Sequence, residues 1–113
     1  MDNKKFLIIG FIFQEEYFTD ILITITAVCG EKVYVGDGIG AENFLANKIP
    51  VFAGLSGSFH GNKFAKIIYT ITEDPNSLKD IDNALKQNEI NLAENEEIGF
   101  LVQLPVTSFL GPL

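Results

Sequence analysis

The sequence contains no arginine and no tryptophan, and its single cysteine, Cys29, has no partner for a disulfide within the chain. All eight basic residues are lysines, so the chain lacks the guanidinium fork that holds a phosphate or a guanine through two parallel hydrogen bonds. We therefore expect no binding to nucleic acid, because phosphate neutralisation supplies much of that affinity. A lone cysteine is typical of a reducing compartment and predicts a cytoplasmic protein.

Long hydrophobic runs are also missing. The longest, residues 6–13, has eight residues, whereas a helix needs about 20 to cross a bilayer. It is followed by Gln14, Glu15 and Glu16, so we expect neither a membrane helix nor a secretory signal. With 113 residues, of which 47% are hydrophobic, the chain is predicted to form a single domain over residues 1–113.

The negative charge is concentrated in one part of the chain. Residues 73–97 hold eight acids and two lysines, a net charge of −6 out of −7 for the whole chain. This run predicts an acidic, solvated face. Within it, Glu94, Glu96 and Glu97 could also hold a divalent cation through carboxylate oxygens, although their spacing matches no EF-hand loop.

The first half of the sequence predicts a strand, a helix and a second strand. Residues 5–14 are a continuous β-branched and aromatic run, which is typical of a strand central in a sheet. A helix is predicted from Glu15 to Cys29, because apolar residues recur at spacings of three and four before Gly30. The alternative for this segment is a strand, since it is rich in β-branched residues. Residues 32–35 predict the second strand.

The next segment offers a long loop, a strand and a helix. Residues 41–62 show no sustained period and are predicted as a long irregular loop, which in a compact domain is usually functional. Residues 64–72 alternate and form the clearest strand. Asp74 and Pro75 are predicted as the N-cap and first residue of a second helix, which ends near Asn88.

The last segment completes the fold prediction. Residues 89–97 are expected to form an acidic loop and residues 98–106 a final strand, in which Pro105 indicates an edge strand or a strand end. The order of elements predicts an α+β, ferredoxin-like βαββαβ sandwich, an antiparallel four-stranded sheet with two helices on one face. The other sheet face would be apolar, which predicts a homo-oligomer.

A glycine-rich segment is the first candidate binding motif. It consists of Gly36, Asp37, Gly38, Ile39 and Gly40. Successive glycine N–H groups could cradle a phosphate. The alternative is a tight turn, because such turns need residues that adopt positive φ. The segment lacks the spacing of a dinucleotide-binding fingerprint and the lysine of a P-loop.

Residues 54–63 are the second candidate. Ser58, His60 and Lys63 could bind an anion or a metal there, or the segment could be a plain surface loop. Because His60 is the only histidine, a histidine-rich metal centre would need several subunits. Cys29 with His60 could act as a nucleophile, but Cys29 closes an apolar helical stripe, where cysteine is more often a small buried hydrophobe. No nucleophile with base and orienter can be read from the sequence, so we predict no enzyme activity and no particular cofactor.

The chain resembles the PII-like signalling proteins, the trimeric ferredoxin-like superfamily that includes nitrogen-regulatory PII and, more distantly, CutA. The matching stretches are KKFLIIGFIFQ at residues 4–14, ITAVCGEKVYVGDGIG at residues 25–40 and GFLVQLPV at residues 99–106. Residues 41–62 stand where PII proteins carry their T-loop. The basic phosphate-binding loop that precedes the last strand in PII proteins is replaced here by the acidic residues 91–97.

The resemblance implies a homotrimer that senses a small ligand, such as an adenine nucleotide, in clefts between subunits. Gly38 and Gly40 would line the phosphate end of the cleft. The ligand would set the shape of the loop at residues 41–62, which would then dock on a protein target. The CutA relationship implies an alternative, a trimeric metal-binding or assembly module.

Overall fold

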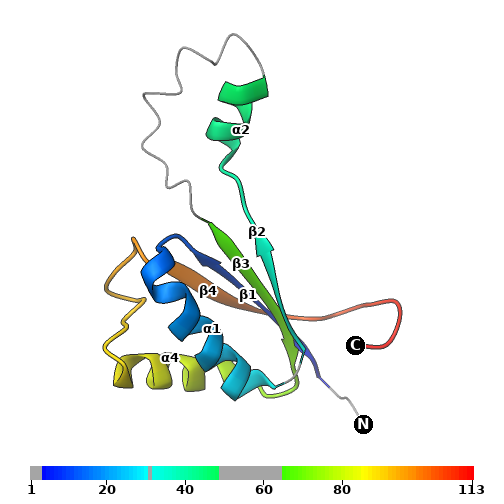
Figure 1. Cartoon of the computed structure of the whole chain (residues 1–113). Coiled ribbons are helices and arrows are strands. Elements are labelled where there is room, and N and C mark those ends of the chain that lie inside the picture. The colour runs from blue at the N-terminus through cyan, green and yellow to red at the C-terminus, as the bar shows by residue number, and fades with distance from the viewer. Residues whose placement is uncertain (1–3, 31, 49–64) are drawn as a thin grey trace.

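The computed structural model describes residues 4–30, 32–48 and 65–113. Figure 1 shows a layer of strands with helices packed along one side of it. The elements follow in the order β1 (Phe6–Ile12), α1 (Glu15–Cys29), β2 (Val33–Asp37), α2 (Ala41–Lys48), β3 (Lys66–Thr72), α4 (Ser77–Gln87) and β4 (Gly99–Pro105).

The strands form one four-stranded antiparallel sheet in the order β2-β3-β1-β4. Helices α1 and α4 cover the same face of this sheet (Figure 1). The predicted α+β ferredoxin-like fold is therefore confirmed. Pro105 is the last residue of an edge strand, where its missing N–H removes no bond within the sheet. Among the described residues, none of the helices is long and apolar enough to cross a membrane.

Strand β1 lies in the middle of the sheet, as its continuous apolar run predicts. It pairs with β3 on one side and with β4 on the other. Every second residue, from Ile8 through Gly10 to Ile12, is buried under the helices. A Cβ on Gly10 would overlap the end of the Leu101 side chain, which would have to change its rotamer to make room.

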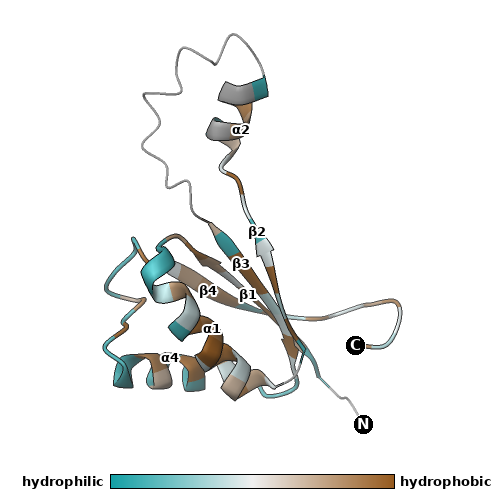
Figure 2. Cartoon of the chain, viewed as in Figure 1, coloured by the Kyte–Doolittle hydropathy of each residue, from teal (hydrophilic) through white to brown (hydrophobic). Residues whose placement is uncertain are grey.

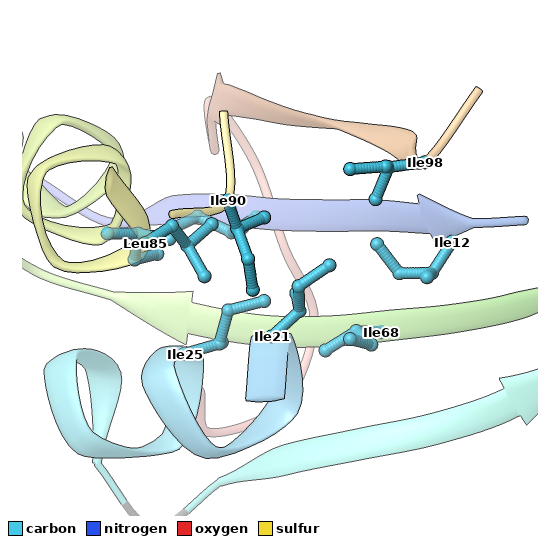
Figure 3. Close-up of a cluster of buried hydrophobic side chains, with 9 residues drawn as sticks. Ile12, Ile21, Ile25, Ile68, Leu85, Ile90 and Ile98 are labelled. Atoms are coloured by element: carbon cyan, nitrogen blue, oxygen red, sulfur yellow. The ribbon is translucent and has the colours of Figure 1, made fainter. Parts of the chain in front are cut away.

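The core of the described structure consists almost entirely of isoleucine. Eight isoleucines and one leucine form a single buried cluster between the sheet and the two helices (Figure 3). Isoleucine is restricted to few side-chain rotamers, so ordering it on folding loses little conformational entropy. The members are Ile8, Ile12, Ile21, Ile25, Ile68, Ile81, Leu85, Ile90 and Ile98.

Helix α1 has the bounds that the sequence predicts, and the alternative of a strand for this segment is wrong. Ile21 and Ile25 are fully buried, so the three–four stripe faces the sheet. The helix ends at Gly30, whose φ of +97° a side chain would disfavour and whose N–H donates to the carbonyl of Thr26.

Two predictions about the middle of the chain are wrong. Strand β2 runs to Asp37, two residues further than predicted, because its pairing with β3 continues. The first part of the predicted irregular loop is a helix, α2, while residues 49–62 lie outside the described structure. Alanine, glutamate, leucine and lysine are good helix formers, but eight residues are too few to reveal a helical period.

The predicted start of α4 is also wrong. The Asp74 carboxylate accepts a hydrogen bond from the N–H of Asn76 at 2.8 Å, which closes a local turn. The turn takes up Asp74 and Pro75, so the helix begins only at Ser77. Its end next to Asn88 is as predicted.

Gly99→Ala should destabilise the fold strongly. Gly99 has a φ of +147°, and a Cβ there would overlap the backbone carbonyl oxygen of Phe11. We expect the substitution to lower the free energy of unfolding by about 2–4 kcal/mol, measured by urea denaturation. Gly36→Ala is the control, because its Cβ would approach nothing closer than 3.6 Å. Equal losses for both variants would contradict this assignment.

Candidate functional site

The glycine-rich segment begins inside the sheet. Gly36 and Asp37 belong to β2, and the Gly38 N–H donates to the carbonyl of Ala65 at 2.9 Å, which extends the pairing by one residue. The exposed Asp37 carboxylate forms an ion pair with Lys66 on β3. Neither Gly36 nor Gly38 has a positive φ. The interpretation of this segment as a tight turn is therefore wrong.

The second half of the segment leads directly into a helix. The carbonyl of Gly40 accepts the N–H of Phe44, which begins α2. Ile39 is 74% exposed and Phe44 49% exposed. Figure 1 shows that β2 carries α2 away from the helix-covered sheet, so we call residues 38–48 the arm. A phosphate site at its base stays a prediction.

Ser58, His60 and Lys63 lie outside the described residues, so their role in binding an anion or a metal stays a prediction. Within the described ranges, no group of three or more histidine, cysteine, aspartate or glutamate residues is gathered as a metal would require. Glu94, Glu96 and Glu97 are exposed. These three carboxylates therefore lie on a solvated surface, as the acidic run predicts.

The sheet face opposite the helices is apolar throughout. In antiparallel pairing, directly opposed residues share a face, and here Ile9 lies between Tyr69 and Val102. Tyr69 lies opposite Tyr34 in turn. We call this surface the open face; its eleven positions are Leu7, Ile9, Phe11, Tyr34, Gly36, Ile67, Tyr69, Ile71, Phe100, Val102 and Leu104.

No position of the open face bears a charged side chain. Tyr34 is 66% exposed and Leu104 48% exposed, and the rings of Phe11 and Phe100 stack with centroids 5.1 Å apart. A monomer rarely leaves an uninterrupted apolar surface of this extent in water. The open face is therefore a candidate interaction surface.

Cys29 lies half-buried at the end of α1 and packs against the isoleucine core. Burial raises the pKa of its thiol above the ordinary value of 9.0, and the negative charge of Asp74 raises it further. A hydrogen bond with Ser77 acts in the opposite direction. Ser77 also shares a buried hydroxyl contact of 2.8 Å with Thr72. The thiol therefore stays protonated near neutral pH, which fits a packing role better than a nucleophilic one.

A groove of about 610 Å³ lies between α4 and β4, and sequence reasoning missed it. The Gln103 side chain joins its two walls: the amide oxygen accepts the Leu78 N–H at 3.2 Å, and the amide nitrogen donates to the Pro75 carbonyl at 3.0 Å. Only a glutamine within an otherwise apolar strand hinted at this role. The lining is mostly apolar and comes from Pro75, Leu78, Lys79, Asp82, Leu85, Leu92, Ala93, Phe100, Leu101 and Gln103.

No protein-family model matches the chain, and a search of curated proteins found no match. The function is therefore argued from the geometry described above.

The raised pKa of Cys29 predicts slow alkylation of the folded protein. Because Cys29 is the only thiol, modification by iodoacetamide reports on it alone. At pH 7.5 we expect the folded chain to react several-fold more slowly than the chain in urea. The folded-state rate should rise with a midpoint above pH 9.0, since the folded state holds the proton more tightly. A pH midpoint of alkylation that is lower in the folded chain than in the unfolded chain would contradict a raised pKa for Cys29.

Proposed function

We propose that this protein is a non-enzymatic sensor and adaptor of the PII-like kind, which assembles as a homotrimer, binds a small ligand at the base of the arm and contacts a protein target through residues 41–62. The observation that carries the proposal is the open face. The ferredoxin-like fold supports it, and so does the arm, which extends from the end of β2.

The distribution of charge favours a second copy as the partner of the open face. Two chains of net charge −7 repel each other, and the repulsion is smallest where neither surface is charged. The open face meets that condition, while the acidic residues 73–97 include α4, which packs on the opposite face of the sheet (Figure 2). Burial of apolar surface contributes about 25 cal/mol per Å², so strands facing strands would stabilise an assembly.

The arm provides the second part of the proposal. It exposes Ile39 and Phe44, two apolar side chains that a protein target could bury. Gly38 and Gly40 lie at its base. A ligand with an anionic group, such as an adenine nucleotide, would bind there and change the conformation of the arm. The resemblance to PII proteins supports the trimeric state and this ligand class.

Tyr69→Glu should dissociate the assembly. Tyr69 lies in the middle of the open face and is 40% exposed in one chain, so a carboxylate is tolerated in a monomer but not between two sheets. Light scattering after size-exclusion chromatography should give three times the mass of one chain for the wild type and one for the variant. Ile23→Glu is the control, because Ile23 is 63% exposed on α1 and should not alter the mass. A monomeric wild type would refute the assembly.

Ligand binding should depend on Gly38. We expect one of a panel of adenine nucleotides, cyclic dinucleotides, 2-oxoglutarate and bicarbonate to raise the melting temperature, since a ligand at 100 times its Kd adds about 2.7 kcal/mol of stability. Gly38→Val should abolish that increase, because a Cβ there already lies 3.3 Å from the Ile67 side chain and the remaining methyls would fill the strand end. Gly111→Ala should retain it: its φ of +95° makes that change locally strained, but the Cβ would meet nothing within 4 Å and the residue lies outside the glycine-rich segment. No response to the whole panel would contradict the sensor function.

A further inference from the structure

The groove between α4 and β4 lies beside a strand edge with free hydrogen-bonding groups. The Val106 N–H donates to the Lys5 carbonyl at 2.9 Å, and bonds of an antiparallel ladder alternate along the strand. The even-numbered residues of β4 therefore bond to β1, whereas Leu101 and Gln103 direct their N–H and C=O groups outward. Among the described residues, no hydrogen bond reaches these backbone groups.

The groove has the lining of a site for an extended peptide. On one side it is lined by residues of the edge strand β4. The apolar part of its lining, which we call the floor, includes the partly exposed Leu78 of α4 and Leu92 of the following segment, whereas Leu85 is fully buried. A strand added along β4 would gain main-chain hydrogen bonds from the edge, and every second side chain would enter the apolar floor.

One end of the groove is strongly acidic. Ala93 lines it, and the exposed Glu94, Glu96 and Glu97 follow directly. Of the ion pairs within the described ranges, none involves these three carboxylates, and Lys86 pairs with Asp82 at 3.0 Å. The groove lining itself holds one lysine, Lys79, and one acid, Asp82, so the excess of negative charge comes from the three glutamates. A second copy of this acidic chain is a poor occupant here, whereas a cationic segment would be attracted.

We propose that this groove binds an extended basic peptide segment of a partner protein, added as a strand along β4, with apolar side chains on the groove floor and lysine or arginine against the acidic end. This surface lies between α4 and β4; it shares only Phe100 with the open face and no residue with the arm. The proposal therefore goes beyond the sensor function and does not depend on the trimer.

The first experiment is a titration with a fluorescein-labelled peptide, Lys-Lys-Ser-Leu-Thr-Leu-Ser-Lys-Lys, followed by fluorescence anisotropy. Lysines at both ends serve either strand direction. We expect binding that weakens as salt is added, and no binding of the peptide with glutamate in place of every lysine. Equal binding of the two peptides would overturn the charge complementarity. Repeating the titration on Tyr69→Glu keeps the result independent of assembly, because that residue lies on the opposite face.

Amide exchange measured by NMR locates the peptide. In the complex, exchange of the Leu101 and Gln103 amides should slow at least about tenfold. Val35 is the matched control, because it lies on the other edge strand and also directs its N–H outward. Protection at Val35 instead, or binding without protection of Leu101, would overturn the proposal. Protection of Leu101 in the free protein that disappears on dilution would assign the groove to a second copy and also overturn it.

Matched charge reversals complete the test. Glu94→Lys should weaken binding of the basic peptide roughly tenfold. Glu16→Lys makes the same change at an exposed position on α1, outside the groove lining, and should leave the affinity nearly unchanged. Both positions are exposed, so neither variant threatens the fold. An equal loss of peptide affinity in the two variants would show that binding responds to net charge alone, and it would refute the proposal that the peptide lies in the groove.

Discussion

The structure depends on one constraint: a four-stranded sheet has two faces, and two helices cover only one of them. The isoleucine cluster joins the covered face to α1 and α4, and it accounts for most of what is fully buried in the described chain. The other face is equally apolar, yet no helix of the described residues covers it. The proposed assembly follows from this difference between the two faces, because exposure of the apolar open face to water is unfavourable.

Charge is separated from the apolar surfaces in the same way. The acids of residues 73–97 belong largely to α4 and the segment after it, and the sheet contributes only the pair of Asp37 with Lys66 at the far end of β2. A chain with this distribution can bring its sheets together while its helices stay solvated. The two surfaces proposed to bind partners therefore differ in kind, since one is apolar and the other is acidic.

The sequence predicts those features that depend on neighbours along the chain. The bounds of α1 follow from a stripe and a terminal glycine, and the central place of β1 follows from its unbroken apolar run. Helix α2 is too short for a period, and the start of α4 depends on the local turn made by Asp74. The groove is formed by α4 together with β4. Gly99 has a positive φ and lies against the backbone of Phe11 on β1. Such pairings arise only on folding, so no local pattern reveals them.

The hydrogen bond from Gly38 to Ala65 has a consequence for how this chain can change over evolutionary time. It is the last bond of the β2–β3 pairing among the described residues. The described pairing of β2 with β3 is thus complete without residues 39–64, and doubling the length of a connecting segment costs only about 0.6 kcal/mol in loop-closure entropy. Selection can lengthen, shorten or rewrite this stretch for a new target while the isoleucine core remains the same.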